Sequence, residues 1–307
     1  MAQNPVLLVP GCGGNILYGR DCITGKTMQV FPRLFGGDKL SRRFMLVDLD
    51  QDAKTVQLVR NTEVFAPQDD FGLFACATLL PKLSFMHDRV SYYADIQKLL
   101  KKNGYINGKN LFGLAFDWRK SVTELIYPFL DRVEEVFQSA GRERITIITH
   151  SAGSLIARTA FALNPDYFSD RIKNWICIAS AFQGTSRLLD CWLRGYALGI
   201  SEFFIQRRTF RALQLKCQMA HWLIENLSFR FSPKLAIAKK SKENEVNINK
   251  VQTTDTDLYN WYSIHVPWEG GECFDFDSCK DQDAEKIMNQ VRIEGGESEE
   301  SDKLFDY

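Results

Sequence analysis

The sequence predicts an α/β protein with a mostly parallel sheet, helices on both faces of that sheet and a helical lid region. The chain has 307 residues, of which 45% are hydrophobic, so it can form one large domain with a substantial core. Over residues 4–184, short apolar stretches alternate with stretches whose apolar residues recur at helical spacing. This alternation is typical of βαβ units, which build parallel sheets. After Gly184 the alternation stops, and a helix-like, aromatic and basic stretch begins.

The predicted strands are short, apolar and bounded by glycine or by polar turn residues. The first of them ends in the glycine-rich turn PGCGGN, residues 10–15. Two further strands are expected as a pair joined at a polar turn. The main strands lie within residues 4–15, 109–119, 144–153 and 172–184, and the pair lies at residues 43–50 and 54–60.

Three helices are predicted between these strands, at residues 88–105, 122–141 and 154–163. In the first, Gly104 stands where a glycine often closes a helix C-terminus. The second is amphipathic, although it contains Pro128, which cannot donate a backbone hydrogen bond. The third follows directly on a strand.

Composition divides the chain into three parts. Residues 1–187 are expected to form the core, residues 188–268 a lid or cap, and residues 269–307 an acidic and poorly ordered tail. The tail holds 13 acidic and 4 basic side chains, a balance of −9, and because the whole chain is neutral the residues before it carry +9. A mildly basic body suits an anionic membrane surface.

Targeting, membrane and metal signals are absent from the sequence. Met1 is followed almost at once by an apolar stretch with no basic region or cleavage site. No uncharged apolar run reaches the roughly 18 residues of a membrane span. The 8 cysteines show neither paired nor zinc-ligand spacing, which indicates reduced thiols. We therefore expect a cytoplasmic protein that can associate peripherally with membranes and that has no metal site.

The segment THSAG, residues 149–153, contains the candidate catalytic residue, Ser151. It lies between a buried strand and a helix, at the strand end where open α/β sheets bind ligands. α/β-Hydrolases present a nucleophilic serine on such a corner, in the pattern G-x-S-x-G, because strand and helix approach closely there. Gly153 matches this pattern, whereas Thr149 occupies the first glycine position. Ser151 is therefore predicted to be a nucleophile; the competing interpretation is a serine that only caps a helix.

Acyl transfer also requires two backbone N–H groups that stabilise the tetrahedral oxyanion. The residue after the nucleophile, here Ala152, normally supplies one, and a loop after an earlier strand supplies the other. The segment PGCGGN is a suitable loop because glycine lets a backbone approach a ligand closely. A phosphate-binding loop is the alternative, but the segment lacks G-x-x-x-x-G-K-S/T, and Ile16 breaks the dinucleotide pattern G-x-G-x-x-G.

Four segments of the chain, in order and spacing, resemble the lecithin:cholesterol acyltransferase family, most closely its plant and protist phospholipase A and acyltransferase members. The likeness covers most of residues 4–230, with a weaker echo in IHVPWEGG at residues 264–271. The four segments are PVLLVPGCGGNIL (5–17), NGYINGKNLFGLAFDWR (103–119), ITIITHSAGSLIARTAF (145–161) and KNWICIASAFQGTSR (173–187).

The resemblance implies an α/β-hydrolase-type fold and lipid acyl chemistry, for which no metal or dissociable cofactor is needed. It implies that Ser151 is the nucleophile and that the N–H of Cys12, after the Pro-Gly of the first strand, joins that of Ala152 in binding the oxyanion. The Asp-Trp-Arg block at residues 117–119 corresponds to a positional landmark. The expected partners are a phospholipid, a sterol or other acyl acceptor, and a membrane surface; nucleic acid is not expected.

The acid and the base of a catalytic triad are not identified. The family's acid block resembles D-G-D-G-T-V, with the base a few tens of residues later, and neither block is present. His265 follows Asp255 and Asp257, so the order Ser, Asp, His is formally available, but in linker-like sequence. His221 lies in an aromatic, helix-like stretch and is expected to pack within the lid. His150 adjoins the serine, but neighbouring side chains on a strand point to opposite faces.

Two functions therefore remain open. In the first, the chain is a phospholipase A or O-acyltransferase that works through an acyl-serine, in a C-terminally incomplete version of a longer protein. In the second, it is a catalytically inactive, truncated paralogue that binds lipid or regulates, because a serine without a base is a weak nucleophile. An unstable translation product is a third interpretation. In either function, the aromatic and basic residues of 188–232 suit a lipid surface, or equally a helical layer packed over the sheet.

Overall fold

The structure is a computed structural model, and it describes residues 3–33, 37–49, 56–57, 61–81, 91–185, 187–195, 205–223, 266–267 and 273–274. Its centre is a four-stranded sheet with the order β7-β1-β8-β9, in which every neighbouring pair is parallel. These strands are β1 (Val6–Val9), β7 (Leu111–Gly113), β8 (Ile145–His150) and β9 (Ile172–Ile178). The predicted α/β class with a mostly parallel sheet is confirmed.

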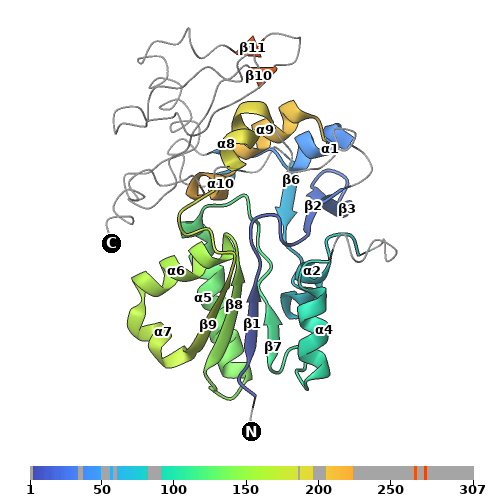
Figure 1. Ribbon diagram of the computed structural model, residues 1–307. Coiled ribbons are helices and arrows are strands. Elements are labelled where there is room, and N and C mark those ends of the chain that lie inside the picture. Colours follow the sequence, from blue (N-terminus) through green and yellow to red (C-terminus); the bar gives the residue numbers. More distant parts are fainter. Residues whose placement is uncertain are drawn as a thin grey trace, which may run out of the picture.

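Helices cover both faces of this sheet (Figure 1). One face carries α5 (Val122–Ser139), α6 (Gly153–Leu163) and α7 (Pro165–Arg171), and the other carries α2 (Leu73–Ala77) and α4 (Ala94–Lys102). In β1, Leu7 and Val9 pack with the α5 and α6 side, and Val6 and Leu8 pack with the α2 and α4 side. This alternation follows from the two-residue period of a strand, and it makes β1 apolar throughout because both its faces are buried.

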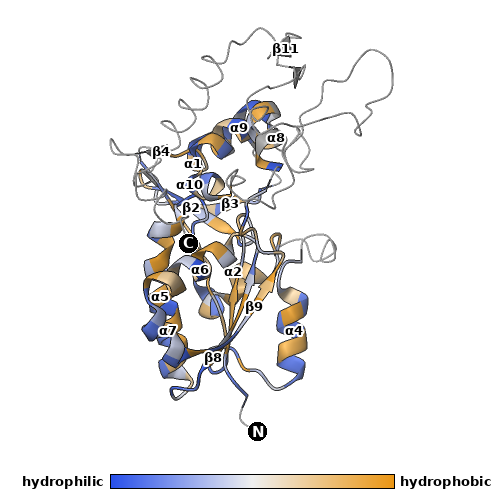
Figure 2. Ribbon diagram, turned by 60° about the vertical axis from the view of Figure 1, so that its left-hand side comes forward, coloured by the Kyte–Doolittle hydropathy of each residue, from blue (hydrophilic) through white to orange (hydrophobic). Residues whose placement is uncertain are grey.

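The helix α5 begins and packs as its sequence predicts. Ser121 accepts a hydrogen bond from the backbone N–H of Glu124, whose carboxylate accepts one from the N–H of Ser121, which completes a capping box. The inward side of the helix is fully buried, and the exposed Pro128 lies on the outward side. Figure 2 shows the resulting amphipathic colouring of α4 and α5, beside strands that are largely hydrophobic.

A second sheet was not predicted from the sequence. It is antiparallel with the order β3-β2-β6, formed by β2 (Leu17–Asp21), β3 (Thr27–Phe31) and β6 (Thr62–Phe65). The short helix α1 (Gly37–Phe44) and the 3-10 turn η1 (Asp69–Gly72) were also not predicted. The expected strand pair is present as β4 (Asp48–Leu49) and β5 (Val56–Gln57), while residues 43 and 44, which were expected in the first of these strands, belong to α1. A further antiparallel pair joins β10 (Val266–Pro267) and β11 (Cys273–Phe274).

Two predicted elements are shorter than expected. The helix expected at 88–105 begins only at Ala94, because Tyr92 and Tyr93 use their backbone N–H groups to bond the carbonyls of Ala77 and Cys76. Its end is as predicted, with Gly104 at φ 88°. The strand expected at 109–119 ends at Gly113, since the residues that follow turn across the carboxyl end of the sheet.

Helices α8 (Arg187–Arg194), α9 (Arg207–Lys216) and α10 (Gln218–Trp222) lie beyond the carboxyl ends of the strands, next to α1 (Figure 1). Apart from Arg187, these helices fall in residues 188–268, the predicted lid, as does β10; the division of the chain into core, lid and tail stays a prediction. None of the helices in the described ranges has the length and apolar character that a membrane-spanning helix needs.

Candidate active site

Ser151 lies at a tight corner between β8, which ends at His150, and α6, which begins at Gly153. Its φ is 51°, in the left-handed region, where a residue other than glycine carries a strain of about 1–3 kcal/mol. Two backbone hydrogen bonds hold this conformation: the N–H of Ser151 donates to Ile178 O at 3.0 Å, and Ser151 O accepts from Ser154 N at 3.0 Å. A strained strand-to-helix turn of this kind is how the α/β-hydrolase type of fold exposes a serine.

Two glycines allow the chain to close around this corner. A Cβ on Gly153 would lie 2.3 Å from Pro10 O and 2.8 Å from Val9 O, so the start of α6 and the end of β1 touch through backbone. A Cβ on Gly11 would lie 2.8 Å from the Cβ of Ser151. The glycine-rich loop after β1 therefore lies directly against the serine, which is where the sequence analysis expected it.

Thr149 occupies the first glycine position of the hydrolase pattern and is fully buried. Its hydroxyl oxygen accepts a hydrogen bond from Trp175 Nε1 at 2.9 Å and lies 2.7 Å from the hydroxyl of Ser154 on α6. The hydroxyl of Ser154 in turn lies 2.6 Å from that of Ser180. A threonine is tolerated at this position because its polar group is satisfied and because the facing helix residue is small.

The N–H groups of Cys12, in the loop after β1, and of Ala152, directly after Ser151, donate no hydrogen bond among the residues that the structure describes. Ala152 is fully buried, so an unpaired N–H at this position is unfavourable unless a ligand accepts it. The carbonyl of Gly11, which precedes Cys12, accepts a hydrogen bond from Gly14 N at 3.0 Å. In the described part of the chain both groups therefore lack an acceptor, and their role as oxyanion donors stays a prediction.

The side chain of Cys12 is not a candidate nucleophile. Its hydrogen bond with the thiol of Cys217, together with burial, raises the pKa of Cys12 well above the ordinary value of a cysteine. The thiolate is the nucleophilic form, so a thiol with a raised pKa stays protonated and inert. Cys12 therefore contributes to the site through its backbone.

Neither histidine in the described part of the chain is hydrogen-bonded to Ser151. The Nδ1 atom of His150 lies 2.5 Å from the hydroxyl oxygen of Tyr92, and burial lowers the pKa of His150. His221 packs against the ring of Trp192, with 4.8 Å between ring centroids, and its Nε2 lies 2.9 Å from Leu215 O. Burial also lowers the pKa of His221. Its predicted packing role is confirmed by these contacts.

His265, Asp255 and Asp257, which formally offered the order Ser, Asp, His, lie outside the described residues. Within the described ranges, no residue makes a hydrogen bond to the hydroxyl of Ser151. The acid and the base of a triad are therefore not located.

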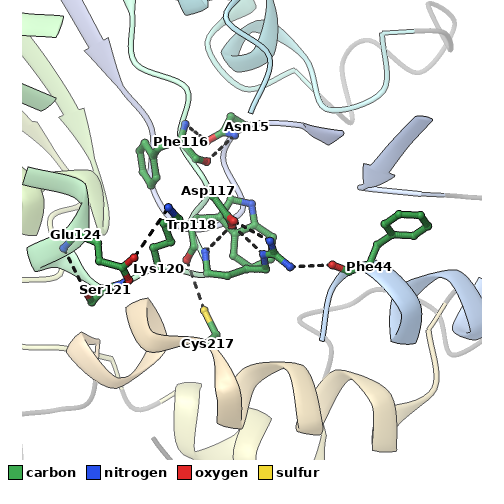
Figure 3. Close-up of polar contacts among 10 residues, drawn as sticks. Asn15, Phe44, Phe116, Asp117, Trp118, Lys120, Ser121, Glu124 and Cys217 are labelled. Atoms are coloured by element: carbon green, nitrogen blue, oxygen red, sulfur yellow. Dashed lines mark hydrogen bonds and ion pairs between the residues drawn. The ribbon is translucent and has the colours of Figure 1, made fainter. Parts of the chain in front are cut away.

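The Asp-Trp-Arg block forms a buried junction beside the site (Figure 3). The guanidinium of Arg119 donates to both carboxylate oxygens of Asp117, at 2.8 and 2.7 Å, and to Phe44 O at 2.7 Å. Cys217 donates its thiol hydrogen to Trp118 O at 3.5 Å. This block therefore joins the end of β7 to α1 and to the segment between α9 and α10, which is a structural role.

Sequence reasoning did not find two parts of this site: Tyr92, and the hydroxyl group network of Thr149, Ser154 and Ser180. Tyr92 fell within a predicted helix, and its contacts join it to residues far away along the chain. Ser154 and Ser180 are common small polar residues that no local pattern distinguishes.

Comparison with families of known proteins matches residues 43–302 to the family described as lecithin:cholesterol acyltransferase. Two relatives come from Arabidopsis thaliana. Lecithin-cholesterol acyltransferase-like 4 is 31% identical over 254 residues, which cover 79% of this chain and 47% of the relative. Phospholipase A(1) LCAT3 is 32% identical over 259 residues, which cover 80% of this chain and 58% of the relative.

The chain thus spans about half the length of the relatives it matches. Among solved structures, the crystal structure of the Tle4-Tli4 complex matches 72% of this chain and 54% of that chain, at 16% sequence identity and a TM-score of 0.40. A likeness of that degree supports no conclusion about the site.

Proposed function

The chain belongs to the lecithin:cholesterol acyltransferase family, and we propose that it is a lipid acyl hydrolase or O-acyltransferase that acts on phospholipid esters through an acyl-serine. One observation carries this proposal: Ser151 is held at φ 51° against the glycine-rich loop at Gly11, and the N–H groups of Cys12 and Ala152 have no acceptor among the described residues. A helix-capping serine needs neither the strained φ nor the neighbouring free donors. The name of one relative, phospholipase A(1), supports phospholipid as the substrate class.

The chemistry follows from the positions of these groups. The hydroxyl oxygen of Ser151 attacks the ester carbonyl carbon and loses its proton to a general base. The N–H groups of Cys12 and Ala152 hydrogen-bond the oxyanion that forms. When the tetrahedral intermediate collapses, the bond to the lysophospholipid oxygen breaks, the leaving oxygen takes up a proton, and the acyl group stays on the serine. Water then releases a fatty acid, or the hydroxyl of a sterol or other acceptor takes the acyl group.

The helices α8 to α10 expose the basic residues Arg187, Arg207 and Arg208, whereas their aromatic residues Trp192 and Phe210 are buried in the core. Exposed basic residues suit contact with anionic lipid headgroups. We propose that they meet the membrane surface from which the phospholipid is taken, in a peripheral and cytoplasmic protein. A mildly basic body before the acidic tail favours contact with anionic lipids.

A second candidate function is a catalytically inactive lipid-binding or regulatory module. The observation that favours it is the lack of a base for Ser151 among the described residues. Removing one member of a catalytic triad leaves only the residual rate due to the oxyanion hole and binding. Such a module would bind phospholipid vesicles without releasing fatty acid.

Fluorophosphonate labelling of the purified 307-residue chain tests the proposal. Ser151→Ala is the test variant, Ser169→Ala on α7 is the serine control because Ser169 is exposed and bonds only Asp166 O, and an active serine hydrolase is the reagent control. Labelling of the wild type and of Ser169→Ala that disappears in Ser151→Ala supports an activated nucleophile. Well-folded wild-type protein that is not labelled refutes autonomous catalysis. Vesicle binding by that same protein would then support the inactive module.

A further inference from the structure

Tyr92 connects the glycine-rich loop after β1 with the strand end that carries Ser151. Its hydroxyl oxygen accepts a hydrogen bond from the N–H of Gly11 at 2.9 Å and lies 2.5 Å from Nδ1 of His150. The rings of Tyr92 and His150 meet edge to face, with centroids 5.4 Å apart. Two segments separated by about 140 residues in the sequence thus meet at one phenol group.

The two hydrogen bonds of Tyr92 determine where its own hydrogen lies. The phenol oxygen already accepts from Gly11, and no other acceptor for the phenol hydrogen occurs within the described ranges. That hydrogen is therefore satisfied when it is donated to Nδ1 of His150. His150 is then a neutral imidazole with its proton on Nε2, a state that agrees with its burial.

This contact fixes the peptide next to the one that supplies an oxyanion donor. Tyr92 holds the N–H of Gly11, which belongs to the Pro10–Gly11 peptide, and the N–H of Gly14 holds the carbonyl of Gly11, which belongs to the Gly11–Cys12 peptide, at 3.0 Å. Because C=O and N–H point in opposite directions across a trans peptide, holding the carbonyl of Gly11 sets the direction of the next N–H, that of Cys12. The direction of that donor thus depends on both partners of Gly11.

Gly14 gives Tyr92 access to this loop. A Cβ on Gly14 would lie 2.4 Å from Cζ and 2.5 Å from the hydroxyl oxygen of Tyr92. The ring therefore packs directly on the loop backbone. Its neighbour Tyr93 differs in this respect, because its hydroxyl donates to Val9 O within β1 at 2.9 Å and does not touch the loop.

We propose that Tyr92 is a positioning residue of the acyl-transfer site: it holds the Pro10–Gly11 peptide through Gly11 N–H and is itself held by His150 Nδ1, so that the next peptide, Gly11–Cys12, presents the N–H of Cys12 to the oxyanion. The inference deepens the proposed function and rests on it. Tyr92 does not touch the reacting atoms, and it acts through the loop. A residue with only a structural role would stabilise the fold without affecting the donor.

Tyr92→Phe tests this inference, with Tyr93→Phe as the matched control, since each removes one tyrosine hydroxyl from adjacent positions. The first measurement is amide hydrogen exchange of Gly11 by NMR, and the second is the Nδ1 resonance of His150 in protein labelled with ¹⁵N-histidine. The third is the rate of fluorophosphonate labelling at Ser151. Thermal melting of both variants serves as the folding control.

In Tyr92→Phe we expect the exchange of Gly11 to accelerate and the Nδ1 resonance of His150 to shift, with both unchanged in Tyr93→Phe. We expect labelling to slow roughly ten- to hundredfold in Tyr92→Phe, since small displacements of a catalytic group have effects of this size. Unchanged exchange of Gly11, or equal labelling rates in the two variants at matched stability, would overturn the inference.

The design separates this inference from the proposed function. A wild-type chain that is not labelled refutes the proposed function, and the contacts of Tyr92 would then have no role in catalysis. The exchange and ¹⁵N measurements need no activity, so they still decide whether Tyr92 holds the loop.

Discussion

The buried pair of Asp117 and Arg119 makes a prediction whose size follows from the structure. The side chain of Arg119 is 1% exposed and that of Asp117 is 7% exposed, so neither charge is solvated by water. Two hydrogen bonds join their side chains, the backbone N–H of Arg119 also donates to Asp117, and the guanidinium donates to Phe44 O. Replacing Arg119 with methionine leaves the carboxylate of Asp117 buried without its cation.

The expected cost is large because the penalty is that of an uncompensated charge. Breaking a buried pair on one side typically costs about 3–5 kcal/mol of the free energy of unfolding. For a domain of this size that corresponds to a fall of roughly 10 °C in Tm. The double variant Asp117→Asn with Arg119→Met buries no charge, so it should cost less than Arg119→Met alone. The loss of stability in Arg119→Lys should lie between zero and the loss in Arg119→Met, since lysine keeps the positive charge but cannot make the bidentate contact of the guanidinium.

The free energy of unfolding is measured by urea denaturation for the wild type, Asp117→Asn, Arg119→Met and the double variant, which together form a double-mutant cycle. The coupling between the two substitutions should exceed about 1 kcal/mol. A loss of less than about 1 kcal/mol in the free energy of unfolding of Arg119→Met would refute this reasoning. A double variant that loses as much stability as the two single variants together would also refute it, because the two charges would then not be coupled.

Three further predictions concern other parts of the chain. Gly153→Ala should lower the free energy of unfolding by about 1–3 kcal/mol, since its Cβ would meet two carbonyl oxygens at the end of β1, and urea denaturation showing a gain would contradict the close contact. Ser121→Ala should lower it by about 1 kcal/mol through loss of the capping box of α5, measured in the same way, and a neutral result would mean that the cap contributes nothing. Hydrogen bonds from Gln138 and Arg171 lower the pKa of Glu134 from 4.5 to about 2. The ionised Glu134 therefore stabilises the fold above pH 4.5, and this stabilisation is lost as pH falls toward 2. Because Glu134 is 38% exposed, the free energies of unfolding of the wild type and Glu134→Gln should differ by less than about 1 kcal/mol. Thermal melting of both proteins over a range of pH should show this difference disappearing at low pH.

The parts of the fold that were predicted correctly have strong local patterns. The stretch ITIITH is β-branched and apolar, and the helix after it starts at a glycine, so the strand, the corner and the helix around Ser151 could be predicted from adjacent residues. The capping box from Ser121 to Glu124 spans only four residues, so it is also a local signal, although it was not recognised from the sequence.

The second sheet was missed because its strands have no such pattern. β2, with the sequence LYGRD, contains a glycine and two charged residues, and it is recognisable as a strand only through its partners. β3 and β6 pair with it on either side. Strand formation at such sequences depends on cross-strand neighbours more than on intrinsic preference.

Local patterns were enough to predict the parallel α/β core, the serine corner and the family resemblance, and that resemblance added Cys12 as a candidate N–H donor. Those patterns lie in residues that are close together in the chain, where spacing and side-chain shape limit the backbone. Only the tertiary structure brought Gly11 against Ser151, gave Thr149 a partner in Trp175 and joined Tyr92 to the loop. These contacts link residues tens to more than a hundred positions apart, and they depend on the order of strands in the sheet, which no local pattern specifies.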